Sequence, residues 1–327
     1  MKKLLIIGDS TSTFIVTQAI PLAKLFSTEY KIDILCSSPT SFTYSKHIPY
    51  FNDCLCLSKK DGKIKILETE EIKSMEPNCK VKDMKLLQYF DHFLNHDEDD
   101  LELQEGFKNK LEEYDKLLII YDGDSYYMKS TIALIKESFK NKCFGRLHEW
   151  TNSCKPLDEN KYIPKETVEA FGYTWNDELL EFNPIWFKDF DPNIKYNNFS
   201  VGLCCFSCCE SKNPFLEDDT FFQSTKLQKI LEKHGFNLYK NTRMNEPKKQ
   251  IFYCMCKNFL TVDNFFYWVY RSINKKSPIC FSPLTKQREI QLDTKRIIPN
   301  NINKLHELTA ELIAELFIKQ INHIKMF

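Results

Sequence analysis

The sequence predicts an α/β protein of two layered domains, because apolar runs of strand length alternate with helical segments along its 327 residues. Residues 4–7 form a first apolar run, a helix follows from Pro21, and residues 32–36 form a second run. Strand, helix and strand in this order make the parallel crossover unit. The same alternation returns after residue 198. The length suits two domains, and a hydrophobic content of 43% is enough for two cores.

The first domain is predicted over residues 1–160. Its opening strand leads into a loop with a short turn and then a helix beginning near Pro21, where the ring is tolerated in a first turn. A single helix kinked at Pro21 is the alternative. Further strands are predicted at 53–58, 115–125 and 143–150, and further helices at 85–96, 101–114 and 125–142.

A connector is predicted over residues 161–198, because prolines and aromatic residues interrupt any regular period there. It has a short helix near 165–171 or 176–182. The second domain, 199–303, is predicted to contain strands at 198–207, 236–241, 249–256 and 277–282, and helices at 224–235 and 261–273, the latter capped by Thr261. The segment 304–327 is predicted to be a final helix, because its apolar residues recur at helical spacing.

Charge balance, the lengths of the apolar runs and the cysteine positions argue against a nucleic-acid binder, a membrane-spanning protein and a metal site. The 45 acidic and 45 basic residues balance, whereas a nucleic-acid binder usually shows a basic surplus. No apolar run approaches the length of a membrane-spanning helix, and the run after Met1 is too short for a signal peptide, so a cytoplasmic protein is expected. Most of the paired cysteines fall within apolar strands, where thiols act as small hydrophobic groups, so no metal site is expected.

Polar turns follow two of the buried strands, each with the sequence Gly-Asp-Ser, at 8–10 and 123–125. Ligands of open parallel sheets gather at the carboxyl ends of strands. Backbone N–H groups and hydroxyls after the first strand are expected to hold a sugar or phosphate oxygen, with the acceptor-binding candidates Ser10, Thr11, Ser12 and Thr13. The alternative is an ordinary loop whose hydroxyls cap the next segment.

The catalytic candidates are Asp9, Asp124 and His148. Either carboxylate can act as a general base toward an attacking hydroxyl, and His148 exchanges protons near neutral pH. The simpler interpretations are that Asp is a good turn former and that His148 is a hydrogen-bonded, partly buried side chain.

Four residues of the second domain are candidates for binding a donor substrate. Lys286 and Arg288 can neutralise a diphosphate, and Glu289 can accept from a pair of ribose hydroxyls. Ser207 follows the strand at 198–207 and offers a further contact. A solvated charged loop is the alternative for the group at 286–289.

Residues 6–38, "IIGDSTSTFIVTQAIPLAKLFSTEYKIDILCSS", are similar to the opening of GT-B glycosyltransferases, and residues 113–134 resemble a later strand and helix of their acceptor-binding domain. The resemblance implies two Rossmann-like domains facing across a cleft, with the final helix at 304–327 packing back on the first domain. Thr17 and Gln18 stand where many members carry a histidine, and neither an E-x7-E signature nor a glycine-rich donor loop is evident.

The implied activity is transfer of a hexosyl-type sugar from a nucleotide-diphosphate donor to a hydroxyl of a glycan, lipid-linked or protein acceptor. The resemblance implies no metal and no other cofactor, and is compatible with peripheral contact with a membrane. Two alternatives stay open. One is a GDSL-like esterase or acyltransferase with Ser10 as nucleophile, although its Asp-x-x-His motif is replaced by the sequence at 303–306. The other is a non-catalytic binding protein of the same fold.

Overall fold

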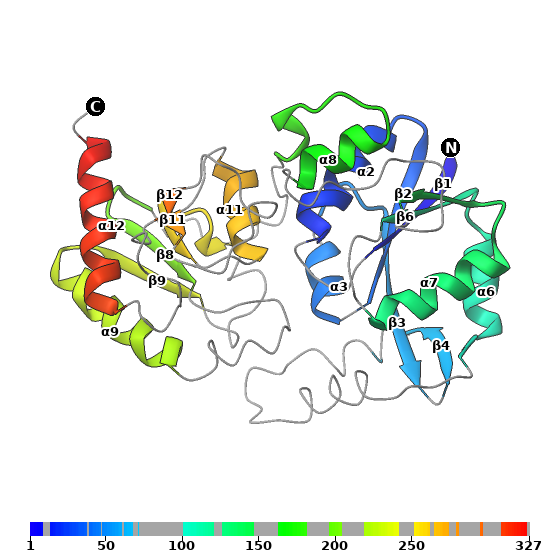
Figure 1. The fold of residues 1–327 in the computed structure, drawn as a ribbon, viewed down its shortest axis with the longest axis horizontal. Coiled ribbons are helices and arrows are strands. Elements are labelled where there is room, and N and C mark those ends of the chain that lie inside the picture. The colour runs from blue at the N-terminus through cyan, green and yellow to red at the C-terminus, as the bar shows by residue number, and fades with distance from the viewer. Residues whose placement is uncertain are drawn as a thin grey trace. The chain divides into compact units, whose positions relative to one another are not determined.

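The computed structural model describes residues 1–8, 14–37, 39–46, 48–60, 62–67, 71, 101–120, 126–146, 163–181, 196–204, 219–241, 252–261, 265–274, 279–280, 295–296 and 309–325. The chain divides into two compact units, each with its own sheet (Figure 1). The first unit contains Met1–Asp158 and Pro164–Leu179, and the second contains Glu159–Ile163 and Leu180–Phe327. The predicted helix at 85–96 lies outside the described residues.

The first unit is built on a seven-stranded sheet of order β5-β4-β3-β2-β1-β6-β7. Five neighbouring strands run parallel, and only β4 pairs antiparallel, with β3. The strands are β1 Lys2–Gly8, β2 Tyr30–Cys36, β3 Asp53–Lys60, β4 Lys63–Ile66, β5 Glu102–Leu103, β6 Lys116–Ile120 and β7 Cys143–Arg146. In chain order the parallel core reads 3-2-1-4-5, which is the arrangement of the Rossmann fold.

Strand β1 lies in the middle of this sheet because both of its faces are apolar. Leu5 and Ile7 join the core formed with α6 (Glu105–Glu112) and α7 (Tyr126–Ser138). Leu4 and Ile6 are fully buried on the other face.

The helix predicted over 101–114 begins later than expected, at Glu105, because Glu102 and Leu103 form β5 and pair with β4.

Helical structure after β1 begins earlier than the sequence predicts. A π-helical turn, η1 (Ile15–Ala19), runs directly into α2 (Ile20–Phe26), so the continuous-helix alternative is the observed one. Pro21 lacks an N–H and its ring crowds the preceding turn of an α-helix. The wider π-turn before Pro21 leaves room for the ring and does not need its N–H. All residues of η1 are buried.

The described part of the connector packs on the first unit. It contains α8 (Ile163–Ala170) and the 3₁₀ turn η2 (Asp177–Leu179), close to the two predicted short-helix positions. The Phe26 ring makes edge-to-face contacts with those of Phe144 and Phe171 at centroid distances of 6.0 and 6.1 Å. Lys24 Nζ donates to the Glu178 carbonyl at 2.6 Å, which fixes η2 against α2.

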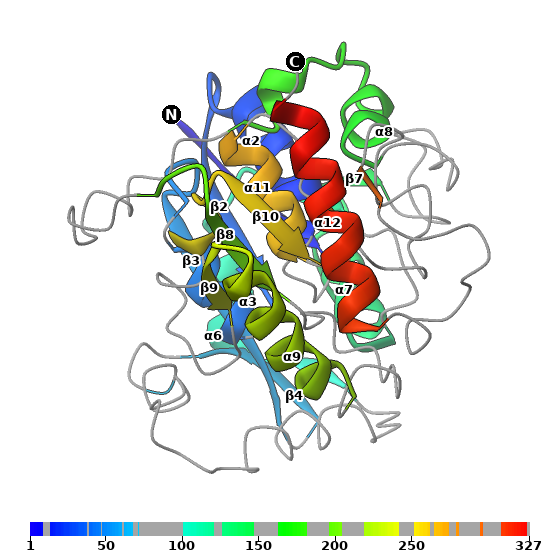
Figure 2. The same cartoon turned by 90° about the vertical axis from the view of Figure 1, so that its left-hand side faces the viewer.

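The second unit has a five-stranded, wholly parallel sheet of order β12-β11-β10-β8-β9. Figure 2 shows α9 and α12 side by side over one face of it. Its elements are β8 Ser200–Cys204, α9 Asp219–Lys233, β9 Asn237–Asn241, β10 Asn258–Thr261, α11 Phe265–Asn274, β11 Ile279–Cys280, β12 Lys295–Arg296 and α12 Ala310–Lys325. In chain order this sheet reads 2-1-3-4-5, the second common doubly wound arrangement.

The C-terminal helix α12 buries one face at helical spacing. Ala310, Ile313, Ala314 and Phe317 join Leu227 and other residues of α9 and β8 in one core. Thr309 caps the helix, because its Oγ1 accepts from the Leu312 N–H at 3.2 Å. The expected packing of this segment on the first domain stays a prediction.

The prediction of a strand over 249–256 is wrong for the described residues 252–256. Phe252 and Tyr253 are helical and a turn follows, in which the Met255 N–H donates to the Phe252 carbonyl at 3.0 Å; the strand here is β10 instead. Alternate burial of Phe252, Cys254 and Cys256 produced the strand-like pattern. Thr261 ends β10 rather than capping the next helix.

Candidate active site

The strand order of the first sheet reverses between β1 and β6, and this switch point is where such sheets bind ligands. Gly8, the last residue of β1, is the register partner of Ile120, the last residue of β6. The segments 9–13 and 121–125 therefore leave from neighbouring strand ends, and each carries the Asp and Ser of a Gly-Asp-Ser sequence.

The second sheet has a corresponding switch point between β8 and β10. Cys204 and Thr261, the last residues of these strands, are register partners. The neighbouring β11 ends at Cys280, which is paired with Thr261. Ser207 follows β8 closely in the sequence, and the group 286–289 follows β11.

All side chains proposed from the sequence lie outside the described residues. They are the catalytic candidates Asp9, Asp124 and His148, the acceptor-binding candidates Ser10, Thr11, Ser12 and Thr13, and the donor-binding candidates Ser207, Lys286, Arg288 and Glu289. The structure describes the strand ends that precede them. Both predicted acidic groups follow strands at the first switch point, and His148 follows the adjacent edge strand β7.

Gly8 has a packing role that the sequence did not indicate. A Cβ at this position would lie 2.1 Å from the ring of Phe14, which is itself buried. The ring thus covers the backbone at the end of β1, and no side chain other than hydrogen fits. This contact packs the residue that precedes η1 onto the end of β1.

Further along the chain, η1 contributes two buried polar side chains. Thr17 and Gln18 are each 2% exposed. They occupy the place where the family resemblance leads one to expect histidine, so this part of the chain supplies no group that titrates near neutral pH. Single π-turns are frequent at functional sites, which agrees with the position of η1 next to the switch point.

Ser37 is a candidate that sequence reasoning missed. It directly follows β2, the neighbour of β1, and is 7% exposed. Its Oγ has no hydrogen-bond partner among the described residues. The signal in the sequence is the run 37–45, in which all residues except Pro39 and Phe42 carry a hydroxyl.

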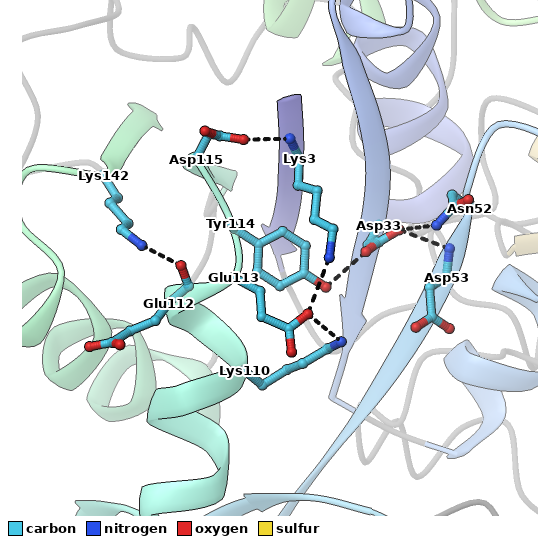
Figure 3. A network of polar contacts seen from close by, with 10 residues as sticks. All are labelled: Lys3, Asp33, Asn52, Asp53, Lys110, Glu112, Glu113, Tyr114, Asp115 and Lys142. Carbon is cyan, nitrogen blue, oxygen red and sulfur yellow. Dashed lines mark hydrogen bonds and ion pairs between the residues drawn. The ribbon is translucent and has the colours of Figure 1, made fainter. Parts of the chain in front are cut away.

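A polar network of hydrogen-bonded side chains lies toward the amino ends of the same strands, which we call the amino edge (Figure 3). At its centre Asp33, in the middle of β2 and paired with the first residue of β3, is buried and accepts three hydrogen bonds through its carboxylate. Tyr114 Oη donates to Oδ2 at 2.8 Å, while Asn52 Nδ2 and the Asp53 N–H donate to Oδ1 at 3.1 and 2.9 Å. Burial, followed by the charge of Asp33, raises the pKa of Tyr114. The network joins β2, the start of β3 and the chain before β6.

Charged side chains at that edge extend the network to β1. The Lys3 N–H donates to Asp115 Oδ2 at 2.7 Å, and Lys3 Nζ lies 3.2 Å from Glu113 Oε2 (Figure 3). Lys110 Nζ lies 3.0 Å from the same carboxylate oxygen. Hydrogen bonds from Lys110 and Lys3 lower the pKa of Glu113. These contacts join strand starts, and we assign the amino edge to folding rather than to chemistry.

Most of the described cysteines are buried, while Cys54 and Cys143 are half-buried. Cys36 Sγ donates to Ser45 Oγ at 3.4 Å, and burial raises the pKa of its thiol to about 12. Burial likewise raises the pKa values of Cys56 and Cys256. Thiols in such surroundings are poor metal ligands. The described part of the chain contains no group of three side chains able to hold a metal ion.

Comparison with known proteins rests on structure, since no protein-family model and no curated protein matches the chain. The E. coli heptosyltransferase WaaC, solved with ADP, matches with a TM-score of 0.59 at 12% identity, over 99% of this chain and 100% of that one. The E. coli ADP-heptose LPS heptosyltransferase II matches with a TM-score of 0.55 at 12% identity, over 99% of each chain. The chain has a GT-B-like fold.

A third solved structure supports the GT-B-like assignment. A glycosyl transferase of family 9 from Veillonella parvula matches with a TM-score of 0.56 at 9% identity, over 98% of each chain. At these identities the likeness concerns the fold, and the expected α/β class with two Rossmann-like units is confirmed. None of the helices in the described ranges has the length and apolar character needed to cross a membrane.

Proposed function

We propose that the protein is a glycosyltransferase that moves a sugar from a nucleotide-diphosphate donor to an acceptor hydroxyl. The observation that carries the proposal is the GT-B-like fold, shared over nearly the full chain with heptosyltransferases, one of which was solved with ADP. The polar segments that follow both switch points supply the side chains that such a reaction needs.

In the proposed reaction the first unit binds the acceptor. Hydroxyls of Ser10, Thr11, Ser12 and Thr13 hold it, and Asp9, Asp124 or His148 removes the proton of the attacking hydroxyl. The acceptor oxygen forms a bond to the anomeric carbon. The bond from that carbon to the diphosphate oxygen breaks, and its electron pair leaves with the nucleotide.

The second unit binds the donor in this proposal. Lys286 and Arg288 neutralise the charge that develops on the departing diphosphate, Glu289 accepts from ribose hydroxyls, and Ser207 contacts the donor. These two cations carry the role that a metal ion fills in other transferases, so the proposed reaction is metal-independent.

A panel of nucleoside diphosphates tests the donor half of the proposal by thermal shift. We expect at least one member, with ADP first in the panel, to raise the melting temperature through preferential binding to the folded state. The double variant Lys286→Ala/Arg288→Ala should lose most of that shift. No shift with any member would contradict the proposal. Labelling of Ser10 by a fluorophosphonate, without a nucleotide response, would support the esterase instead.

The chemical half is tested with Asp9→Asn and the matched control Asp115→Asn. Asp115 lies at the amino edge of the same sheet, where it accepts from the Lys3 N–H. Loss of a general base should lower kcat about 100-fold or more, with the nucleotide-induced shift retained. The control variant Asp115→Asn should keep both the wild-type kcat and the nucleotide-induced shift. Equal rates for Asp9→Asn and the wild type would remove Asp9 from the catalytic role and direct attention to Asp124 and His148.

A further inference from the structure

Ser37 lies at the carboxyl edge of the first sheet, beside the end of β1. Strands β1 and β2 are parallel neighbours in which Ile7 is the register partner of Leu35, so both chains leave the sheet at the same level. Ser37 follows the last residue of β2 and is 7% exposed. It therefore lies at the edge that the proposed function assigns to the acceptor.

The hydroxyls of Ser37 and Ser45 differ in their hydrogen bonding within the described chain. Ser45 Oγ, nearby on α3 (Pro39–Ser45), accepts from Cys36 Sγ at 3.4 Å. Ser37 Oγ has no partner within the described residues. A buried, unpaired hydroxyl is unfavourable, and proteins usually satisfy such groups. A ligand that offers a hydrogen bond at this edge removes that cost when it binds.

The chemistry of the segment favours a neutral ligand. Residues 37–45 contain no lysine, arginine or histidine and no acid, and nearly all of them carry a hydroxyl. Phosphate binding in proteins relies on cations and on charge-assisted hydrogen bonds, which this segment does not supply. Hydroxyls donate to and accept from the hydroxyls of a sugar equally well.

We propose that Ser37 Oγ hydrogen-bonds a hydroxyl of a saccharide acceptor at the carboxyl edge of β1 and β2. The inference rests on the proposed glycosyltransferase function and narrows its acceptor to a carbohydrate. It assigns the contact to a side chain outside the polar turn that the sequence suggested.

The test compares Ser37→Ala with two control variants in the full-length protein. Thr167→Val removes a second fully buried hydroxyl without a partner in the described chain, but on α8 rather than at a strand end. Ser45→Ala removes a buried hydroxyl that does have a partner. A glycan array first selects the saccharide that the wild-type chain binds, and titration then measures its Kd for each variant.

We expect Ser37→Ala to raise the Kd of the selected saccharide about tenfold, because a ligand hydroxyl loses its partner. The melting temperature of the free protein should stay the same or rise, since an unsatisfied group has been removed. Thr167→Val should leave the Kd unchanged. Ser45→Ala should also leave the Kd unchanged, while lowering the melting temperature of the free protein.

Three results would overturn the inference. The first is an unchanged Kd for Ser37→Ala, and the second is an equal loss of affinity in Thr167→Val. The third is a wild-type chain that binds no saccharide on the array. In that last case a retained thermal shift with a nucleoside diphosphate leaves the transferase proposal in place and removes only the carbohydrate acceptor. Failure of both ligands removes the transferase proposal itself.

Discussion

The polar side chains at the amino and carboxyl edges of the first sheet differ in whether they have partners within the described chain. Toward the amino ends, Asp33 in the middle of β2 accepts three hydrogen bonds, one of them from the first residue of β3, and the carboxylate of Glu113 is contacted by Lys3 and Lys110. At the carboxyl edge, the hydroxyl of Ser37 is buried and has no partner among the described residues. The groups described at the amino ends satisfy one another, whereas Ser37 has a hydroxyl to which the described chain offers no partner. We assign the first group to folding, and the proposed function assigns the second to ligand binding.

The largest expected effect is at Asp33. Asp33→Ala leaves the Tyr114 hydroxyl, the Asn52 amide and the Asp53 N–H without their shared acceptor, and we expect the free energy of unfolding to fall by about 3 kcal/mol. Asp33→Asn keeps one acceptor oxygen and should lose less. Urea unfolding of both variants measures the difference. A loss under about 1 kcal/mol in Asp33→Ala would show that the network contributes little to folding.

A smaller effect is expected where β1 ends. In Gly8→Ala the new Cβ meets the buried Phe14 ring, which must move, and overpacking of this kind costs about 2 kcal/mol. Gly106 in α6 is the matched control, because a Cβ there meets nothing within 4 Å, and Gly106→Ala should gain about 0.5 kcal/mol from helix propensity. Chemical denaturation measures both. Equal stabilities of the two variants would mean that the ring does not fix the strand end.

The smallest effect concerns Tyr114 and depends on pH. Its pKa is raised in the folded state, so the neutral phenol stabilises the fold fully below the unfolded pKa of about 10 and this contribution is lost as pH rises beyond it. Tyr114→Phe should lose about 1.5 kcal/mol at pH 9, and its deficit relative to the wild type should shrink by pH 11. Urea unfolding at the two pH values tests this. A deficit that grows with pH would contradict the assigned direction.

Strand positions were predictable from the sequence because parallel, buried strands are continuous apolar runs. The run at 4–7 and the segment at 32–36 both became strands of the first sheet. The turn at Phe252 was misassigned because alternate burial also arises when a tight turn is packed on glycine. A Cβ at Gly202 would lie 2.5 Å from the Tyr253 carbonyl oxygen, which shows how closely this turn approaches β8.

The polar contacts at the two edges were harder to predict. The carboxylate of Asp33 accepts from Tyr114, which lies 81 positions later in the chain, and no local sequence pattern indicates such a contact. The helical start was missed because a π-turn ahead of Pro21 leaves no distinct pattern of apolar residues. Ser37 stands among other hydroxyl residues, and only its burial separates it from them. The residues predicted for catalysis and substrate binding stay predictions.

The segment 164–179 has a practical consequence for anyone who wishes to prepare the first unit alone. A fragment cut near residue 160 would strip Phe171 and Tyr173 from Phe26, whose ring they cover at centroid distances of 6.1 and 5.9 Å. Bare aromatic surface of this kind promotes aggregation. A cut placed after Leu179 retains that cover, and also the carbonyl of Glu178 that anchors Lys24.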